Sequence, residues 1–214
     1  QQRRSQHRID LLDINYLYMP SIDSTFRKKY LEKDENYILK YNYEDRFIVR
    51  TGYSYIYNSA GRALMNNSGI GNSYTIRLNF ELAGNLLYAV AKLGGMKKNA
   101  LGEYTLLNIP FAQYLKGDFD FAKNLVIDNR NSLAFHFGAG IAIPYGNATM
   151  LPFEKRYFSG GANSVRGWSV RDLGPGSFPG DNNFMNQSGD IKLDASIEYR
   201  TRLFWKFRGA LFVD

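Results

Sequence analysis

The feature of this sequence that most constrains its fold is a strict two-residue alternation over Asp190–Phe204. Successive side chains of a β-strand point to opposite faces, so the segment predicts one long strand with a charged face and an apolar face. The even positions are Asp190, Lys192, Asp194, Ser196, Glu198, Arg200 and Arg202, and the odd positions are Ile191, Leu193, Ala195, Ile197, Tyr199, Thr201 and Leu203.

Six further segments alternate in the same way, with differing regularity. They are His7–Met19, Arg46–Asn58, Ser73–Gly84, Phe111–Val126, Ser132–Tyr145 and Arg208–Asp214. The first contains a change of phase around Leu12–Asp13, which predicts a β-bulge. Helical patterns are confined to Ile22–Asp34 and Asn85–Leu93. The sequence therefore predicts an all-β protein of about seven antiparallel strands with one or two short loop helices.

The length of the alternating runs indicates a membrane protein. Strands of soluble proteins average about 5–6 residues, and a bilayer-crossing strand needs about 9–11. An Arg or Lys on the lipid face near the midplane costs about 2–4 kcal/mol, which accounts for a strand face without charges. Aromatic residues form 15% of the chain, and many lie near the ends of the runs. These patterns favour an antiparallel transmembrane β-barrel over the alternative, a soluble β-sandwich or binding module.

Composition excludes several kinds of functional site. The chain has no Cys and only two His, which leaves no disulfide framework and makes a thiolate or histidine metal site improbable. The net charge is +7, but the basic residues are dispersed among acidic ones, so nucleic acid is not an expected partner. Common hydrolase, phosphate-loop and zinc-protease motifs are absent. We therefore expect no enzymatic activity, metal or cofactor.

The connections between the predicted strands differ in length. Asp128–Asn131 and Trp205–Lys206 are short turns, whereas Pro20–Asn42, Asn85–Pro110 and Gly146–Gly189 are long. Outer-membrane barrels have short turns at one end and long loops at the other, so the tendency to alternate agrees with a barrel. The connection of intermediate length at 59–72 does not fit this pattern.

The longest connection contains the most specific motif, Val165-Arg166-Gly167-Trp168, which follows Gly160-Gly161. This combination resembles the sixth extracellular loop of the BamA/TamA family of outer-membrane assembly factors, within the bacterial surface antigen barrel superfamily. The continuation 169–176 is similar to members from Bacteroidota. Two later segments, 195–200 and 209–214, also resemble the strands that follow this loop in the family.

The resemblance implies a sixteen-stranded barrel in the outer membrane of a Gram-negative bacterium. Residues 1–214 would form a partial barrel of about seven strands, with residues 146–189 as the sixth extracellular loop and with the periplasmic POTRA domains outside this chain. Family members insert and fold other barrels. The implied partners are the outer-membrane bilayer, unfolded β-barrel client proteins and accessory periplasmic or lipoprotein subunits. A two-partner secretion transporter of the same superfamily is the alternative function.

The resemblance also implies a role for the motif arginine. In the family this arginine folds into the barrel and pairs with acidic residues on the following strands, and the matching positions are Glu198 and Asp214. A guanidinium can bridge two carboxylates through its fixed fork of donors. Gly167 and Trp168 are expected to pack against the inner wall. The alternative is a solvated loop arginine, with Glu198 as one of several lumen charges.

Overall fold

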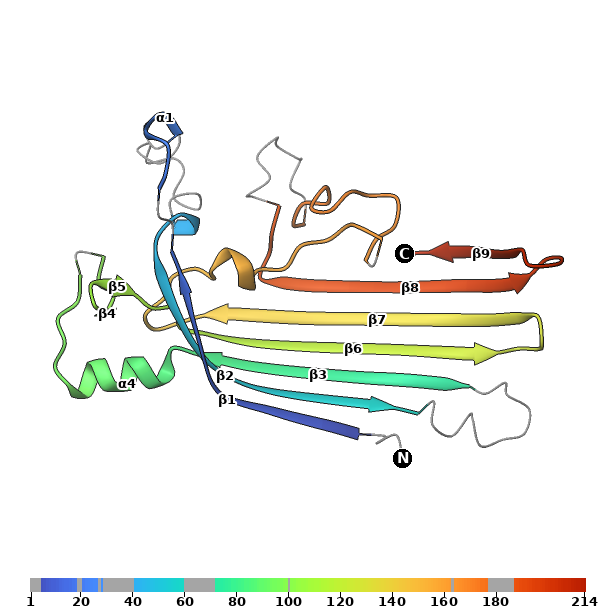
Figure 1. Ribbon diagram of the computed structural model, residues 1–214, viewed down its shortest axis with the longest axis horizontal. Coiled ribbons are helices and arrows are strands. Elements are labelled where there is room, and N and C mark those ends of the chain that lie inside the picture. Colours follow the sequence, from blue (N-terminus) through green and yellow to red (C-terminus); the bar gives the residue numbers. More distant parts are fainter. Residues whose placement is uncertain are drawn as a thin grey trace.

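The structure, a computed structural model, describes residues 5–18, 21–26, 28, 41–59, 72–99, 101–162, 164–176 and 187–214. Its main feature is one antiparallel sheet of seven long strands, with the spatial order β1-β2-β3-β6-β7-β8-β9. The sheet is open, with β1 and β9 at its two edges (Figure 1). The strands are β1 (Ser5–Leu17), β2 (Arg46–Asn58), β3 (Ser73–Ala83), β6 (Tyr114–Val126), β7 (Asn131–Pro144), β8 (Ile191–Arg202) and β9 (Arg208–Val213). The predicted all-β, antiparallel fold class is confirmed.

The helical predictions have different outcomes. The helix α4 (Asn85–Leu93) has the predicted bounds and ends at Gly94. Of the helix predicted over 22–34, the structure shows α1 (Ser24–Phe26), and residues 27 and 29–34 lie outside the described residues. In the part of the chain that the structure describes, no helix is both long and apolar enough to cross a membrane.

Three short elements escaped the sequence prediction. The strands β4 (Thr105–Leu106) and β5 (Ile109–Pro110) form a small hairpin, and η3 (Phe153–Lys155) is a single 3-10 turn. Each has only two or three residues, which is too short to establish a period. Most of the connection at 59–72 lies outside the described residues.

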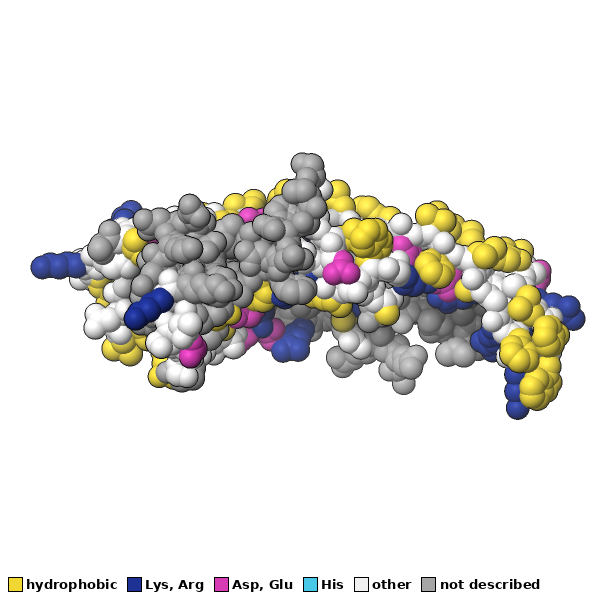
Figure 2. All heavy atoms as spheres, turned by 90° about the horizontal axis from the view of Figure 1, so that it is seen from above, with side chains coloured by type: hydrophobic (Ala, Val, Ile, Leu, Met, Phe, Trp, Pro, Cys, Tyr) yellow, Lys and Arg dark blue, Asp and Glu magenta, His cyan; other side chains and the backbone are white. Residues whose placement is uncertain are grey.

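The exposure of side chains on β8 is inverted relative to a soluble protein. Leu193 is 72% exposed, whereas the side chain of Asp194 next to it is 11% exposed. Ile191 and Ile197 are also exposed, at 66% and 51%. Hydrophobic side chains follow one long edge of the molecule in Figure 2. The apolar face of the sheet is therefore the uncovered one, as expected for a face that meets lipid.

The predicted bulge in the first strand is confirmed, and its position explains why the alternation changes phase. The β1–β2 register shifts between Asp10 and Asp13. Because of this shift, both carboxylates contact basic side chains: Asp10 accepts from Arg8 at 2.9 Å, and Asp13 pairs with Arg50 at 2.5 Å. Without the extra residue, one of the two carboxylates would point to the apolar face.

The buried core lies at one end of the sheet, beneath the long connections, rather than between two layers. Its members are Ile48, Ala83, Ala112, Tyr114, Ala142 and Leu151. Beside it, the buried Arg46 pairs with Glu103 at 3.3 Å and lies 3.8 Å from the ring centre of Tyr41. Among the described residues, no second layer covers the apolar face of the long strands. This arrangement disfavours the soluble β-sandwich, which needs two packed sheets.

Candidate functional site

The loop that joins β7 to β8, residues 146–189, is called the motif loop below; residue 163 and residues 177–186 lie outside the described part. It folds back on itself through isolated bridges between Tyr157 and Gly189 and between Ser159 and Leu173. Gly160 has a φ of 97°, and a Cβ there would collide with the carbonyl oxygen of Ser169. A glycine is therefore needed at the point where the two arms of the loop cross.

The guanidinium of Arg166 reaches across the polar face of the sheet to two carboxylates. Its Nε donates to Asp214 Oδ2 at 2.8 Å and its Nη2 to Asp214 Oδ1 at 2.6 Å. Its Nη1 donates to Glu198 Oε2. The backbone N–H of Arg166 also donates to Asp214 Oδ2, at 2.9 Å. The structure thus brings together the three residues that the sequence singled out, which we call the tip anchor.

Two neighbouring side chains complete the tip anchor. Arg166 Cζ lies 3.6 Å from the ring centre of Phe212, which is directly opposite Glu198 in the β8–β9 register. Arg200 Nε donates to the second oxygen of Glu198 at 2.6 Å, so that carboxylate serves two arginines. The hydrogen bonds to Asp214 and then to Glu198 raise the pKa of the Arg166 guanidinium further above its ordinary value. The charge on Arg166 is therefore permanent, and the site can hold a loop in place but offers no proton to transfer.

The other motif residues do not pack as expected. Trp168 is 53% exposed, and the expected packing of its ring against the inner wall is not seen among the described residues. Its backbone makes the structural contact instead, since its carbonyl oxygen accepts from the N–H of Gly161 at 2.9 Å. Gly167 has a φ of 86° and Gly161 a φ of 92°, so both glycines adopt the left-handed conformation beside this contact. Val165 is partly buried.

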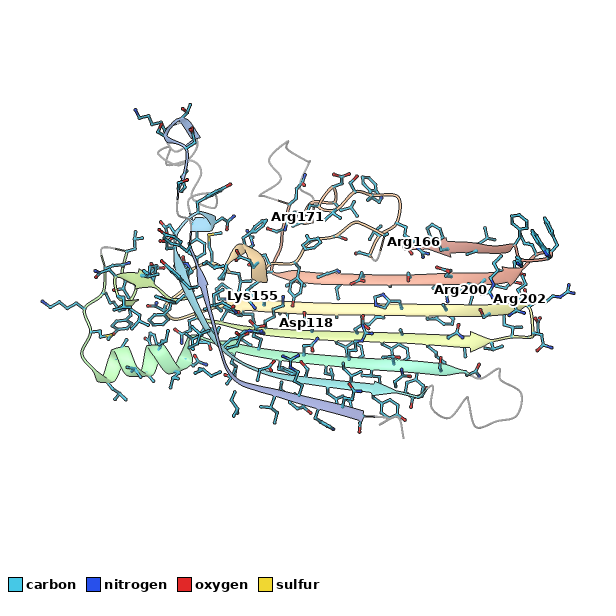
Figure 3. The ribbon with its side chains drawn as sticks, in the orientation of Figure 1. Asp118, Lys155, Arg166, Arg171, Arg200 and Arg202 are labelled. Atoms are coloured by element: carbon cyan, nitrogen blue, oxygen red, sulfur yellow. The ribbon has the colours of Figure 1, made fainter. Side chains whose placement is uncertain are left out.

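A second set of contacts, which the sequence did not reveal, holds the start of the motif loop. Lys155 Nζ pairs with Glu81 of β3 at 2.7 Å, and the hydroxyl of Tyr157 donates to Asp118 of β6 at 2.5 Å. We call these four residues the base anchor. Burial and the hydrogen bond to Asp118 raise the pKa of the Tyr157 hydroxyl, so it remains a donor. Figure 3 shows Lys155 and Asp118 toward the loop-bearing end of the sheet and Arg166 farther along it, beside β9.

One sequence signal could have located the base anchor. Gly138 and Gly140 occupy the polar face of β7, where neighbouring strands carry long side chains. Two glycines on one face leave space above the sheet, and the ring of Tyr157 fills the space above Gly140. The signal gives the place of a contact, but not which loop residue makes it.

The polar face also carries His136, whose ring nitrogens lie 2.6 Å from Asp120 and 3.6 Å from Asp194. Among the described residues, no group of three His, Asp or Glu side chains has an arrangement that could hold a metal ion. His136 is thus one member of a network of polar contacts that spans β6, β7 and β8.

Comparison with known proteins identifies the family to which this chain is similar. A model of the Omp85 superfamily domain matches residues 12–214, almost the entire chain. No curated protein sequence gives a significant match. Members of this superfamily are non-enzymatic proteins of the outer membranes of Gram-negative bacteria and of organelles, where they insert or transport other proteins. The open antiparallel sheet, the uncovered apolar face and the family match agree: the chain belongs to the Omp85 superfamily.

Proposed function

We propose that this protein inserts and folds β-barrel clients in the outer membrane of a Gram-negative bacterium, as the BamA/TamA family does. In this proposal the seven strands are part of a sixteen-stranded barrel, and residues 146–189 are its sixth extracellular loop. The resemblance of 156–176 to that loop supports this role within the superfamily. The implied partners are the bilayer, unfolded barrel proteins and accessory periplasmic or lipoprotein subunits.

Strand length supports the membrane-spanning arrangement. β6 has 13 residues, which extend over roughly 43 Å at about 3.3 Å per residue. Tilted by about 40°, as strands of such barrels are, they cover roughly 30 Å along the membrane normal, close to the thickness of the hydrocarbon core. The short turns at 127–130 and 203–207 then lie on the periplasmic side and the motif loop on the outer side.

The observation that carries the proposal is the bridge from Arg166 to Glu198 and Asp214. Together with the base anchor it joins one loop to β3, β6 and β8 and to the residue that follows β9. A loop fixed to the strands at two places, near its start and at its tip, makes this wall of the barrel stiff. An insertase must open a seam elsewhere and offer a free strand edge to the client, and a stiff wall confines the opening to that seam.

This mechanism needs no chemical step. The free energy that drives insertion comes from hydrogen bonds between the client's strand and the exposed edge. These bonds satisfy backbone N–H and C=O groups that would be costly to leave unpaired in lipid. The paired charges on the polar face keep the lumen hydrated while the apolar face contacts lipid. The motif arginine holds the loop in position and takes no part in a chemical reaction, because all its donors are engaged by fixed carboxylates or face solvent.

The proposal is tested with the protein reconstituted in vesicles, by measuring the rate at which an unfolded barrel client acquires protease resistance. Arg166→Ala and Arg166→Lys should both reduce this rate, because lysine cannot reproduce the bidentate fork on Asp214. Arg171→Ala is the matched control, since Arg171 lies in the same loop and contacts the rings of Phe153 and Phe158 rather than a strand carboxylate.

Two outcomes would count against the proposal. Equal activity of Arg166→Ala and the unaltered protein would remove the motif loop from the mechanism. Translocation of a soluble exoprotein across the vesicle membrane, without insertion of barrel clients, would assign the protein to two-partner secretion instead.

A further inference from the structure

The polar face of the sheet is hollowed at the end that bears the short turns. The hollow has a volume of about 820 Å³ and is lined by residues of β3, β6, β7, β8 and β9 and of the turn before β7. Three arginines line it close to the turns, namely Arg130, Arg202 and Arg208. We call them the mouth arginines. Figure 3 shows Arg202 at this end of β8, far along the sheet from Lys155.

The mouth arginines share the polar side of the sheet. Arg202 is an even number of positions from Glu198 on β8, so both side chains lie on one face. Arg208 is directly opposite Arg202 in the β8–β9 register, where like charges are unfavourable. Arg130 belongs to the turn before β7, and its carbonyl oxygen accepts from the N–H of Arg202 at 2.9 Å. The three arginines therefore border one space that faces away from lipid.

The positive charge of this space is not compensated within the described part of the chain, where none of the mouth arginines makes a salt bridge. Two carboxylates also line the hollow, but both are engaged. Glu198 accepts from Arg166 and Arg200, and Asp128 accepts from backbone and side-chain donors of its own turn. An anion that enters the hollow would therefore meet guanidinium groups with free donors.

The floor of the hollow is uncharged and polar. It includes Ser73 of β3, Asn124 of β6 and Ser132 of β7. From β3 to β9 the sheet order has four strand spacings, which is about 19 Å at about 4.8 Å each. An extended chain of about six residues covers this distance at about 3.3 Å per residue. The hydroxyl and amide groups of the floor can pair with the N–H and C=O groups of such a chain.

We propose that the hollow binds an extended polypeptide segment rich in Asp and Glu. The mouth arginines would bind its carboxylates through bidentate hydrogen bonds, and the floor would pair with its backbone. In the membrane arrangement proposed above, the hollow opens at the periplasmic end of the lumen. The unfolded client is then the polypeptide that supplies the segment, and this identification rests on the proposed function.

Other anions fit the hollow less completely. A free phosphate ion can bridge Arg202 and Arg208, but it leaves the polar floor on β3 and β6 unused. Lipid headgroups are disfavoured because the apolar face of the sheet, not this one, is the face suited to lipid. An acidic polypeptide is the ligand that uses both the mouth arginines and the floor.

Peptide binding tests the site without requiring insertion. The full-length protein is placed in nanodiscs of phosphatidylcholine, and the anisotropy of fluorescent peptides is measured. The probe alternates Glu and Ser and is long enough to cross the hollow, and its comparison peptide has Gln in place of Glu. We expect the Gln peptide to bind at least about tenfold more weakly. Added salt should weaken binding of the Glu peptide, and an equal concentration of inorganic phosphate should not displace it.

Arginine variants then locate the binding. Arg202→Gln and Arg208→Gln should each weaken binding of the Glu peptide about tenfold, because each removes a charge-assisted contact. Arg77→Gln is the matched control. Arg77 lies on the polar face of β3, opposite Asp120 in the register, and lines a different hollow. This variant removes the same charge from the same face and should leave the affinity unchanged.

Stability without peptide separates binding from a structural role. Arg208→Gln should not lower the denaturation midpoint, because it removes the repulsion with Arg202. A lower midpoint would show that Arg208 is paired inside the protein, and would overturn the proposal.

Three binding results would also overturn it. These are equal affinity for the Glu and Gln peptides, unchanged affinity in both arginine variants, and displacement of the peptide by phosphate, which would indicate a small-anion site. Client insertion is measured on the same samples. Insertion without peptide binding would remove this inference alone, whereas peptide binding without insertion would support the acidic-segment site and remove the proposed function.

Discussion

The ring of Tyr157 lies directly over Gly140, so closely that a Cβ on Gly140 would be 2.7 Å from two ring carbons and 2.8 Å from the hydroxyl oxygen. The missing side chain on β7 is therefore what lets the motif loop descend onto the sheet. At this depth the Tyr157 hydroxyl reaches Asp118 on the next strand. A strand glycine and a loop tyrosine together fix the height at which the base anchor forms.

Gly140→Ala should therefore displace the ring of Tyr157 and break its hydrogen bond to Asp118. Inserting a methyl group into a packed site typically costs about 1–3 kcal/mol of unfolding free energy. The loss should appear as a lower midpoint for denaturation in detergent and as faster proteolysis within the motif loop.

Gly52→Ala is the matched control for that experiment. Gly52 lies on the polar face of β2, opposite Glu81, and a Cβ there would meet its neighbours at an ordinary 3.7 Å. This variant should unfold at the same denaturant concentration as the unaltered protein. Equal effects of the two substitutions would show that Tyr157 does not depend on the space above Gly140.

The sequence pattern sufficed for the strands and for the polar-face position of Glu198, whereas the pairing of Arg166 with Glu198 and Asp214 was implied by the family resemblance of the loop motif. A two-residue period over 12 or more positions determines which side chains share a face, so Glu198 could be placed on the polar face in advance. The base anchor could not be found in this way. The path of an irregular loop depends on packing rather than period, so the contact between Tyr157 and Asp118, 39 positions apart, has no periodic signal. The exposure of Trp168 could not be predicted for the same reason, because it depends on the path of the loop.

The two carboxylates of the tip anchor should differ in importance. Asp214 accepts the backbone N–H, Nε and Nη2 of Arg166, whereas Glu198 divides its oxygens between Arg166 and Arg200. Asp214→Asn should accordingly speed proteolysis of the motif loop more than Glu198→Gln does. In a double-mutant cycle with Arg166→Ala, the coupling should be stronger for Asp214. A stronger coupling for Glu198 would contradict this order of importance.

The lipid-facing side of β8 can be tested with a single charge. Leu193→Arg would place a guanidinium on the exposed apolar face, at a cost of about 2–4 kcal/mol near the bilayer midplane. We expect a clear loss of the folded, membrane-inserted form, measured by its altered electrophoretic mobility before and after heating.

Ser196→Arg provides the comparison for Leu193→Arg on the same strand. Ser196 lies on the opposite face, between Asp194 and Glu198 in the alternation and opposite His136 in the register. An arginine there would meet acidic neighbours in a hydrated space, so folding and insertion should be nearly unchanged. If Leu193→Arg kept the folded, inserted form and Ser196→Arg lost it, the assignment of the two faces would be reversed.

The turn between β6 and β7 should make stability depend on acid pH. The side chain of Asn131 and the backbone N–H groups of Arg130 and Asn131 donate to Asp128, at 2.7, 2.6 and 2.9 Å, and lower the pKa of its carboxyl. A carboxyl whose pKa is lower in the folded state stabilises the fold above its ordinary pKa, and this contribution disappears as the pH falls through the folded value. The difference in unfolding free energy between the unaltered protein and Asp128→Asn should thus be constant near neutral pH and shrink in acid. Denaturation in detergent across this range measures the difference, and a carbon-13 titration of the Asp128 carboxyl above its ordinary pKa would contradict the expected sign.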